Sequence, residues 1–318
     1  MPRTNQLHAP KPALNRTCPP KSQRSKVASK AACSVLMYKT ALMQRIADHV
    51  RLGYKFWTAG TVEPNRAQVL VDKFAHLYDT NLSRHQKAYA RILGQASATL
   101  LLWSPTSERT FADPLPTSDH TLPTSDGSEQ TTANSEMTSP KRPQTSPKLH
   151  WFLLITPGEH LTHRLETLRD ASTLQGRIEL TGYELVTLPR VGQSKPAWTW
   201  RMTATTYTAW RQRLISAARR HLNGLNRELQ VLTRTPGFAG CRVQVKKLLY
   251  LAKAEASRRM SAEQVGNVTF PTRVPYLQRV NQQGVALTAW KSSIQNNSLC
   301  VPVRISLRDP VWTDPSRS

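Results

Sequence analysis

Residues 104–147 separate two parts of the sequence that can each form regular structure. Two closely similar heptads, LPTSDHT and LPTSDGS, follow one another inside a tract of Ser, Thr, Pro and Asp. The tract holds six acidic residues against three basic ones, and its few large apolar residues cannot bury enough surface to order it. We therefore predict a disordered acidic insertion, so any fold must be assembled from the segments on either side.

The two segments that border the insertion are predicted to be strands. SATLLLW ends just before it and LHWFLLIT begins just after it, and both are apolar runs of strand length. If they pair, residues 31–103 and 148–265 are two halves of one α+β domain with a mainly antiparallel sheet and helices on one face. We expect residues 1–30 to be a basic disordered arm and residues 266–318 an extended tail.

Hydrophobic periodicity predicts the remaining elements. In the first half it indicates a short strand at YKFWT and three helices, at 34–52, 64–78 and 83–93, the last with a Ser83/Gln86 capping box. In the second half the expected elements are a helix from Thr156 with Leu161, Leu165 and Leu168 on one face, strands in RIELTGYELVTL and AWTWRM, one long helix over 204–232, a last helix over 239–260, and an edge strand in CVPVRISL.

The charge of the chain indicates its class of partner. Its 318 residues include 44 Lys and Arg against 20 Asp and Glu, which gives a net charge of +24. Residues 1–60 carry +10 and residues 148–318 carry +15. An excess of this size favours nucleic acid over an anionic membrane or a merely well-solvated surface. No apolar run reaches transmembrane length, so we expect a cytoplasmic, nucleoid-associated protein with no membrane partner.

Metal, cofactor and catalytic motifs are not evident in the sequence. The four cysteines (Cys18, Cys33, Cys241 and Cys300) are scattered, which argues against a zinc site or a disulfide framework. Glu159, His160 and His163 lack the i, i+4 histidine spacing of a zinc helix. Neither a phosphate-binding glycine loop nor a nucleophile elbow is present. We predict no metal, no cofactor and no catalytic residue.

The helices at 64–78 and 83–93 are a candidate for DNA contact. Their lengths and the four-residue turn between them suit a helix-turn-helix, in which the second helix meets the bases. That helix carries four residues able to reach phosphates or base edges: Arg84, His85, Lys87 and Arg91. An ordinary helical hairpin with a solvated basic face is the alternative.

The stretch TPGFAGCRVQVKKLL resembles the turn of helix-hairpin-helix modules, although Ala239 adds one residue between the two glycines. The resemblance implies that backbone N–H groups of the turn hold a phosphate. The alternative is a tight joint between packed helices, with glycine at a left-handed position. The basic residues that we expect to contact DNA from this region, the preceding helix and the arm are Arg242, Lys246, Lys247, Arg219, Arg220, Lys26 and Lys30.

Alternation in WTWRM places Trp198, Trp200 and Met202 on one face of a strand. If exposed, the two tryptophans would be a stacking platform for unpaired bases. If buried, they belong to the core beneath the helices, which the number of helices favours.

The combination of WTWRMT, YTAWRQR and TPGFAGCRVQV looks like uncharacterised proteins of bacterial plasmids and integrative conjugative elements. We predict a non-enzymatic DNA-binding protein that serves replication, maintenance or transfer of such an element. One alternative is an RNA- or single-strand-binding protein that uses an aromatic sheet face. A second is a DNA-nicking or strand-transfer enzyme with a degenerate site, although neither Tyr183 nor Tyr207 has a His-hydrophobic-His strand to accompany it.

Overall fold

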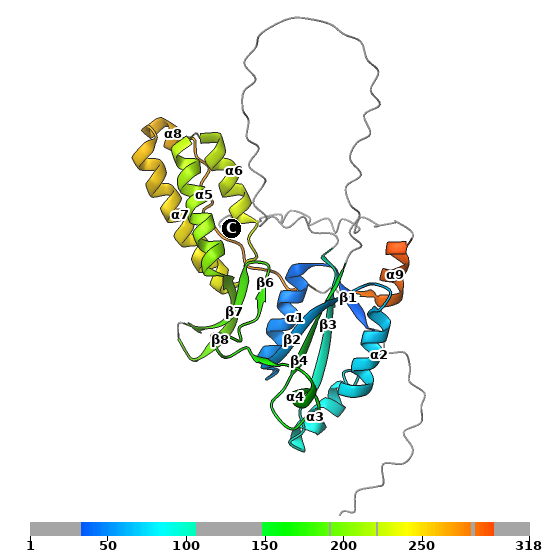
Figure 1. Ribbon diagram of the computed structural model, residues 1–318. Helices are drawn as coiled ribbons and strands as arrows, with labels where there is room; N and C mark the ends of the chain where they lie inside the picture. Colours follow the sequence, from blue (N-terminus) through cyan, green and yellow to red (C-terminus); the bar gives the residue numbers. More distant parts are fainter. Residues whose placement is uncertain (1–32, 106–147, 191, 221, 281–283, 296–318) are drawn as a thin grey trace, which may run out of the picture. The chain divides into compact units, whose positions relative to one another are not determined.

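The computed structural model confirms the α+β class (Figure 1). Predictions made for the arm, for CVPVRISL and for almost all of the insertion lie outside the residues that the structure describes. No helix within the described part of the chain combines the length and apolar character needed to cross a bilayer. The described residues are 33–105, 148–190, 192–220, 222–280 and 284–295.

Six strands form a mixed sheet in the order β5-β2-β4-β3-β1-β9. Neighbours are antiparallel except β1 and β3, which are parallel. β3 and β4 pair from Ala98↔Ile155 to Trp103↔His150, which confirms the strand pairing predicted across the insertion. The strands are β1 (Ser34–Leu36), β2 (Phe56–Val62), β3 (Ala98–Trp103), β4 (Leu149–Ile155), β5 (Arg169–Asp170) and β9 (Val285–Ala286).

The two halves of the chain are interleaved in this sheet. β1, β2 and β3 precede the insertion, whereas β4, β5 and β9 follow it. β4 lies between β2 and β3 and hydrogen-bonds to both along its length. β2 and β3 therefore do not pair with each other. They are joined only through β4, which comes from the second half of the chain.

Residues 34–36 depart from the predicted helix over 34–52. They form β1 beside β3, and helix α1 begins later, at Lys39–Arg51. Val35 is fully buried in its place at the sheet. A short apolar run such as SVLM satisfies helix and strand patterns equally, and the vacant edge of β3 favours the strand.

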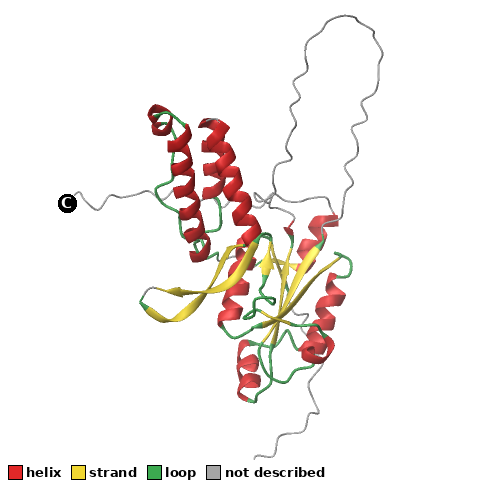
Figure 2. Ribbon diagram, turned by 60° about the vertical axis from the view of Figure 1, so that its left-hand side comes forward, coloured by secondary structure: helices red, strands yellow, loops and turns green. Residues whose placement is uncertain are grey.

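Helices cover both faces of the six-stranded sheet rather than one (Figure 2). On one face, Leu42, Met43 and Ile46 of α1 join a core with residues of β2, β3 and β4. On the opposite face pack α2 (Ala67–Tyr78) and α9 (Leu287–Gln295). The single-face prediction is wrong because β3 and β4 are apolar at successive positions, so both of their faces need cover.

A separate three-stranded antiparallel sheet comprises β6 (Glu179–Leu180), β7 (Tyr183–Arg190) and β8 (Gln193–Met202). The run RIELTGYELVTL is thus two strands rather than one. They are joined at Thr181 and Gly182, which both have positive φ and reverse the chain. β8 is an edge strand, and the helices that follow begin at its end.

The predicted helix over 204–232 is two helices, α5 (Ala204–Arg220) and α6 (Leu222–Thr233), which pack against each other. The apolar spacing runs on through the break, so periodicity alone predicts one continuous helix. The last predicted helix is confirmed as α7 (Ala239–Arg259), which lies beside α5, and α8 (Ala262–Gly266) follows it (Figure 1).

The helix predicted from Thr156 is reduced to α4 (Thr162–Leu165), and Leu161 and Leu165 are exposed rather than packed. The start of that stretch is bent rather than helical, and Glu159 forms an isolated bridge with Gln95. Ala96 N–H donates to the carbonyl of Glu159, and Gly158 has a φ of +128°. The helix α3 (Arg84–Ile92) does have the predicted Ser83/Gln86 capping box.

Candidate nucleic-acid interface

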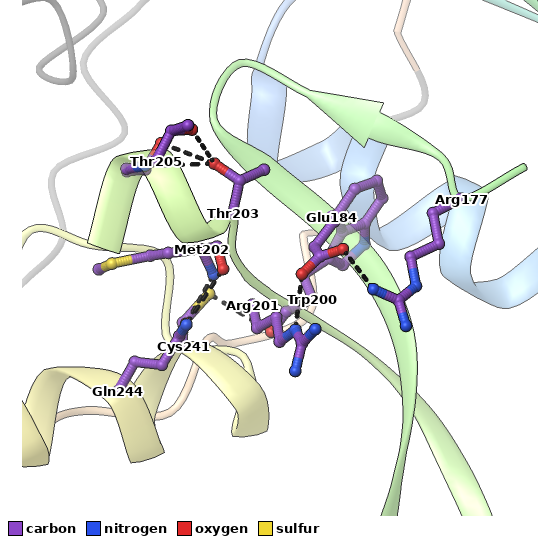
Figure 3. Close-up of polar contacts among 10 residues, drawn as sticks. Arg177, Glu184, Trp200, Arg201, Met202, Thr203, Thr205, Cys241 and Gln244 are labelled. Carbon is purple, nitrogen blue, oxygen red and sulfur yellow. Dashed lines mark hydrogen bonds and ion pairs between the residues drawn. The ribbon is translucent and has the colours of Figure 1, made fainter. Parts of the chain in front are cut away.

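The first turns of α7 are bound to the edge strand β8 (Figure 3). The side-chain amide of Gln244 bonds both backbone groups of Met202, as a neighbouring strand would. Its Oε1 accepts from the Met202 N–H at 2.6 Å, and its Nε2 donates to the Met202 carbonyl at 3.0 Å. The Cys241 thiol lies 3.4 Å from the carbonyl oxygen of Trp200. These contacts fix the direction of α7 relative to the three-stranded sheet.

The same sheet is braced by a buried carboxylate, Glu184 of β7 (Figure 3). It accepts from Arg177 at 2.9 Å and from Arg201 of β8 at 2.7 Å. Both arginines are partly exposed. Arg201 is thereby used to hold β7 and β8 together.

The 236–240 turn is a packed joint. The Gly240 N–H donates to the Thr199 hydroxyl at 3.2 Å in a buried position, so this donor is not available to a phosphate. A Cβ at Gly240 would lie 2.6 Å from the Trp200 carbonyl oxygen, and one at Gly237 would lie 2.3 Å from that of Pro275. Neither glycine has positive φ. Of the two alternatives, the structure therefore supports the tight joint and not a phosphate grip by the Gly240 N–H, and close approach rather than a left-handed backbone requires the glycines.

Arg242 is also used within the protein. Its Nε donates to the carbonyl of Val274 at 2.9 Å, and its guanidinium lies 3.3 Å from the centre of the Tyr276 ring. The side chain thus fastens residues 274–276 to the start of α7. Its predicted contact with DNA competes with these two interactions.

Lys246 and Lys247 lie on an exposed face of α7 together with three residues that the sequence analysis did not select. At about 100° per residue the five positions span an arc of about 120°. Tyr250 is 75% exposed and Val243 is 53% exposed. None of the three lysines has an ion-pair partner among the described residues, and Glu255, the acidic residue of α7, is bonded to Arg258. We call the set the α7 face: Val243, Lys246, Lys247, Tyr250 and Lys253.

A cavity of about 440 Å³ adjoins the α7 face at the start of the helix, and Val243 belongs to both. Trp198, Phe238 and Tyr276 supply its aromatic lining. Two arginines line it as well, and both bond to Asp48: Arg51 at 3.2 Å and Arg279 at 2.7 Å.

Of the two tryptophans considered for stacking, one lines a cavity and the other is buried. Trp198 is half-buried and lines the cavity beside the α7 face. Trp200 is fully buried, and its indole N–H donates to the Met43 carbonyl at 2.8 Å. A stacking role for Trp200 is therefore wrong, because α1 and α7 cover its face of the strand, and the core interpretation holds for it.

The helices proposed as a helix-turn-helix occur at the predicted places, but they lack a shared core. α2 buries four residues and α3 buries none. Two of the four selected side chains are engaged internally. The Lys87 ammonium donates to Thr80 and Thr99, and burial lowers its pKa to about 8. Arg91 donates to the carbonyls of Leu52 and Lys87, whereas Arg84 and His85 are exposed.

The remaining predicted contacts lie elsewhere. Arg219 and Arg220 are exposed in the last turn of α5, where cations also stabilise the helix dipole. They lie at the end of α5 remote from β8, and not on the α7 face. Lys26 and Lys30 fall outside the described residues.

Neither tyrosine considered as the nucleophile of a DNA-nicking enzyme is well placed to attack a substrate. Tyr183 is buried, and burial raises the pKa of its hydroxyl well above the usual value. Tyr207 is partly buried against the core. Within the described ranges, no group of three His, Cys, Asp or Glu side chains is placed to hold a metal ion.

Comparison of the chain with protein-family models, with curated proteins and with solved structures finds no match. The function is therefore inferred from the geometry of the chain itself. The α7 face groups three exposed lysines on one side of a helix. Tyr250 and Lys253 could have been found in the sequence, because they follow Lys246 at helical spacings of four and seven.

Proposed function

We propose that this protein is a non-enzymatic DNA-binding protein that holds the sugar-phosphate backbone along the α7 face. The observation that carries the proposal is the grouping of Lys246, Lys247 and Lys253, without ion-pair partners among the described residues, around the exposed ring of Tyr250. The net charge of +24 supports the same class of partner.

The spacing of the lysines suits a run of phosphates. Lys246 and Lys253 are about 10 Å apart along the helix axis, at 1.5 Å per residue. Each ammonium that neutralises a phosphate releases condensed counterions, and this release is the main source of sequence-independent affinity. Tyr250 lies between them and can add a hydroxyl hydrogen bond to a phosphate.

The composition of the α7 face favours backbone contact over base reading. Direct readout of bases relies on the forked donors of Arg and on the amides of Asn and Gln. Arg242 and Gln244 are the nearby candidates, and both are bonded within the protein. The face itself presents lysines, a tyrosine and a valine, so we propose binding with little sequence preference.

The test is the salt dependence of duplex binding for Lys246→Ala/Lys247→Ala/Lys253→Ala. Alanine preserves the helix, so a loss of affinity reports lost charge. We expect the slope of log K against log salt to fall by up to about 2.7, at about 0.9 per phosphate contact, with all sequences weakened alike. The matched control, Arg211→Ala/Arg219→Ala/Arg220→Ala, removes the same charge from exposed positions of α5.

Equal changes of slope in the two triple variants would contradict a defined interface and leave only general electrostatic attraction. Binding RNA more tightly than DNA of the same sequence would favour the RNA-binding alternative. Service to a bacterial mobile element is a further part of the proposal, supported by the resemblance noted above. Replication or conjugation genes beside the coding sequence would support it.

A further inference from the structure

A second cavity, of about 510 Å³, lies on the face of the six-stranded sheet that α1 also covers. Its floor comes from adjacent strands: Trp57 of β2, His150 and Phe152 of β4, and Trp103 of β3. Thr181, at the turn between β6 and β7, contributes to its wall. The cavity opens to solvent through exposed residues such as Ala59 and Arg169, and its volume is in the range of about 300–1,000 Å³ that is common for ligand sites.

The aromatic rings of this cavity are held in place. Trp57 and Phe152 are stacked, with ring centroids 6.5 Å apart and planes 27° apart. The indole N–H of Trp57 donates to the Gly176 carbonyl at 2.7 Å, which fixes the ring. Trp103 and His150 lie 5.1 Å apart. Trp57, Phe152 and Trp103 are only 6%, 5% and 2% exposed, so a flat ligand in the cavity would contact the exposed edges of these rings.

Polar groups around the rings can recognise the edge of such a ligand. The indole N–H of Trp103 is buried and has no hydrogen-bond partner among the described residues, which costs about 1–3 kcal/mol. That nitrogen is closed to water, so it can donate to a ligand only if the Trp103 side chain shifts. Burial lowers the pKa of His150, which keeps its ring neutral and able both to donate and to accept.

Arg169 and Glu179 complete the lining. The Arg169 guanidinium lies 5.5 Å from the centre of the Trp57 ring and is exposed, so it can meet a phosphate attached to a ligand on that ring. Glu179 is also exposed and offers an acceptor to an amino group. Aromatic rings, edge-reading polar groups and a cation at the rim together describe a nucleotide.

We infer that this cavity binds an unpaired nucleobase of a single-stranded nucleic acid, with the base against Trp57, Phe152 and Trp103 and its phosphate at Arg169. The inference rests on the proposed function and extends it from backbone contact to a bound base. It also places the aromatic sheet face on β2, β3 and β4 rather than on the strand that carries Trp198.

The experiment blocks the cavity without altering its rings. Ala59 is exposed and lines the cavity, so Ala59→Leu fills space that a base would occupy. Thr61 is two residues further along β2, on the same face, exposed and outside the cavity lining, so Thr61→Leu is the matched control. Anisotropy titrations with labelled oligothymidylate and with a duplex give the affinities. Photo-crosslinking of a bromouracil-substituted oligonucleotide locates the base.

We expect Ala59→Leu to weaken single-strand binding by about fivefold, the lower end of what contact between a base and aromatic side chains contributes. Duplex binding should stay within about twofold, and Thr61→Leu should behave as the unaltered protein. Crosslinks should map to peptides that contain Trp57, Trp103 or His150. Equal effects of the two leucine variants, or crosslinks confined to other peptides, would overturn the inference.

Two further experiments complete the test. One distinguishes a polymer from a free nucleotide as the ligand, and the other distinguishes failure of the base site from failure of the α7 interface. Thymidine monophosphate should suppress the crosslink only at far higher concentration than oligothymidylate does; equal potency would overturn a polymer as the ligand. If Ala59→Leu has no effect while loss of the three α7 lysines weakens binding, the base site alone fails. If the lysine variant binds normally while Ala59→Leu is impaired, the proposed α7 interface fails and the base site stands.

Discussion

The hydroxyl of Thr199 accepts a hydrogen bond from the backbone N–H of Gly240 at 3.2 Å. This bond joins an edge strand to the first turn of a 21-residue helix. It uses a donor that a helix-hairpin-helix turn would offer to a phosphate. The joint therefore fixes the start of the helix that carries Lys246, Lys247 and Lys253, and its Gly240 N–H is not available to a phosphate.

Replacing Gly240 tests this joint. We expect Gly240→Val to lower the free energy of unfolding by several kcal/mol, because its Cβ would lie 2.6 Å from the Trp200 carbonyl oxygen and the strand cannot withdraw freely. Thermal unfolding measures the loss. Ala239→Val, at the exposed neighbouring position, should change stability by no more than about 1 kcal/mol. A Gly240→Val protein as stable as the unaltered one would contradict the packed joint.

Replacing Glu184 tests the bracing of β7 against β8. Glu184→Gln keeps the volume but removes the charge that Arg177 and Arg201 share, and we expect a loss of about 1–3 kcal/mol in urea unfolding. The partial exposure of both arginines keeps the loss below that of a fully buried pair. Glu228→Gln, which breaks a single more exposed ion pair with Arg213, should cost less. Equal losses of stability in Glu184→Gln and Glu228→Gln would show that the second arginine at Glu184 does not contribute to stability.

The pH dependence of stability should include a contribution from His49. Burial, with help from Lys87, lowers its pKa from 6.5 to about 4, and its Nδ1 has no partner within the described part of the chain. At pH values between these two pKa values, His49 binds a proton in the unfolded chain but not in the folded protein. Stability should therefore fall as the pH drops through this window, by up to about 3 kcal/mol from this residue.

The variant His49→Phe isolates that contribution, since it keeps a ring beside Tyr54 without a titrating group. Urea unfolding at the two ends of the window should show a smaller loss on acidification for the variant than for the unaltered protein. Identical losses would assign the acid sensitivity to other groups.

Limited proteolysis tests the insertion. We expect cleavage within 104–147, because its composition argues against order, and we expect the two fragments to remain associated under native conditions. The reason is that β4 pairs with both β2 and β3. Size-exclusion chromatography of the cleaved protein gives the answer. Fragments that separate without denaturant would contradict the interleaved sheet.

Local signals predicted the elements whose cause is local. The capping box at Ser83, the helix over 239–260 and the pairing of β3 with β4 all follow from residues that are adjacent in sequence or border one insertion. The errors arose where distant partners decide. Ser34–Leu36 becomes a strand because β3 lies beside it, and residues 156–160 do not form a helix because their backbone bonds to residues 94–97.

The same distinction holds for the candidate sites. Lys246 and Lys247 could be selected from charge and helical spacing alone. Whether a donor is available could not be read from the sequence: Gly240, Arg242 and Lys87 look suitable in the printed chain, yet each is bonded to a group at least seven residues away. The cavity lined by Trp57 and Trp103 is formed by residues of three strands that are distant in sequence, so no short motif reveals it.

The position of β4 between β2 and β3 also has a consequence for synthesis on the ribosome. When residues 98–103 emerge, β2 and β3 each present an open hydrogen-bonding edge, and the strand that closes both is still to be translated. At about 5–20 residues per second, the intervening segment keeps these apolar edges exposed for seconds. We therefore expect a shorter insertion to reduce the time for which these edges are open, and with it the demand of the nascent chain for chaperones.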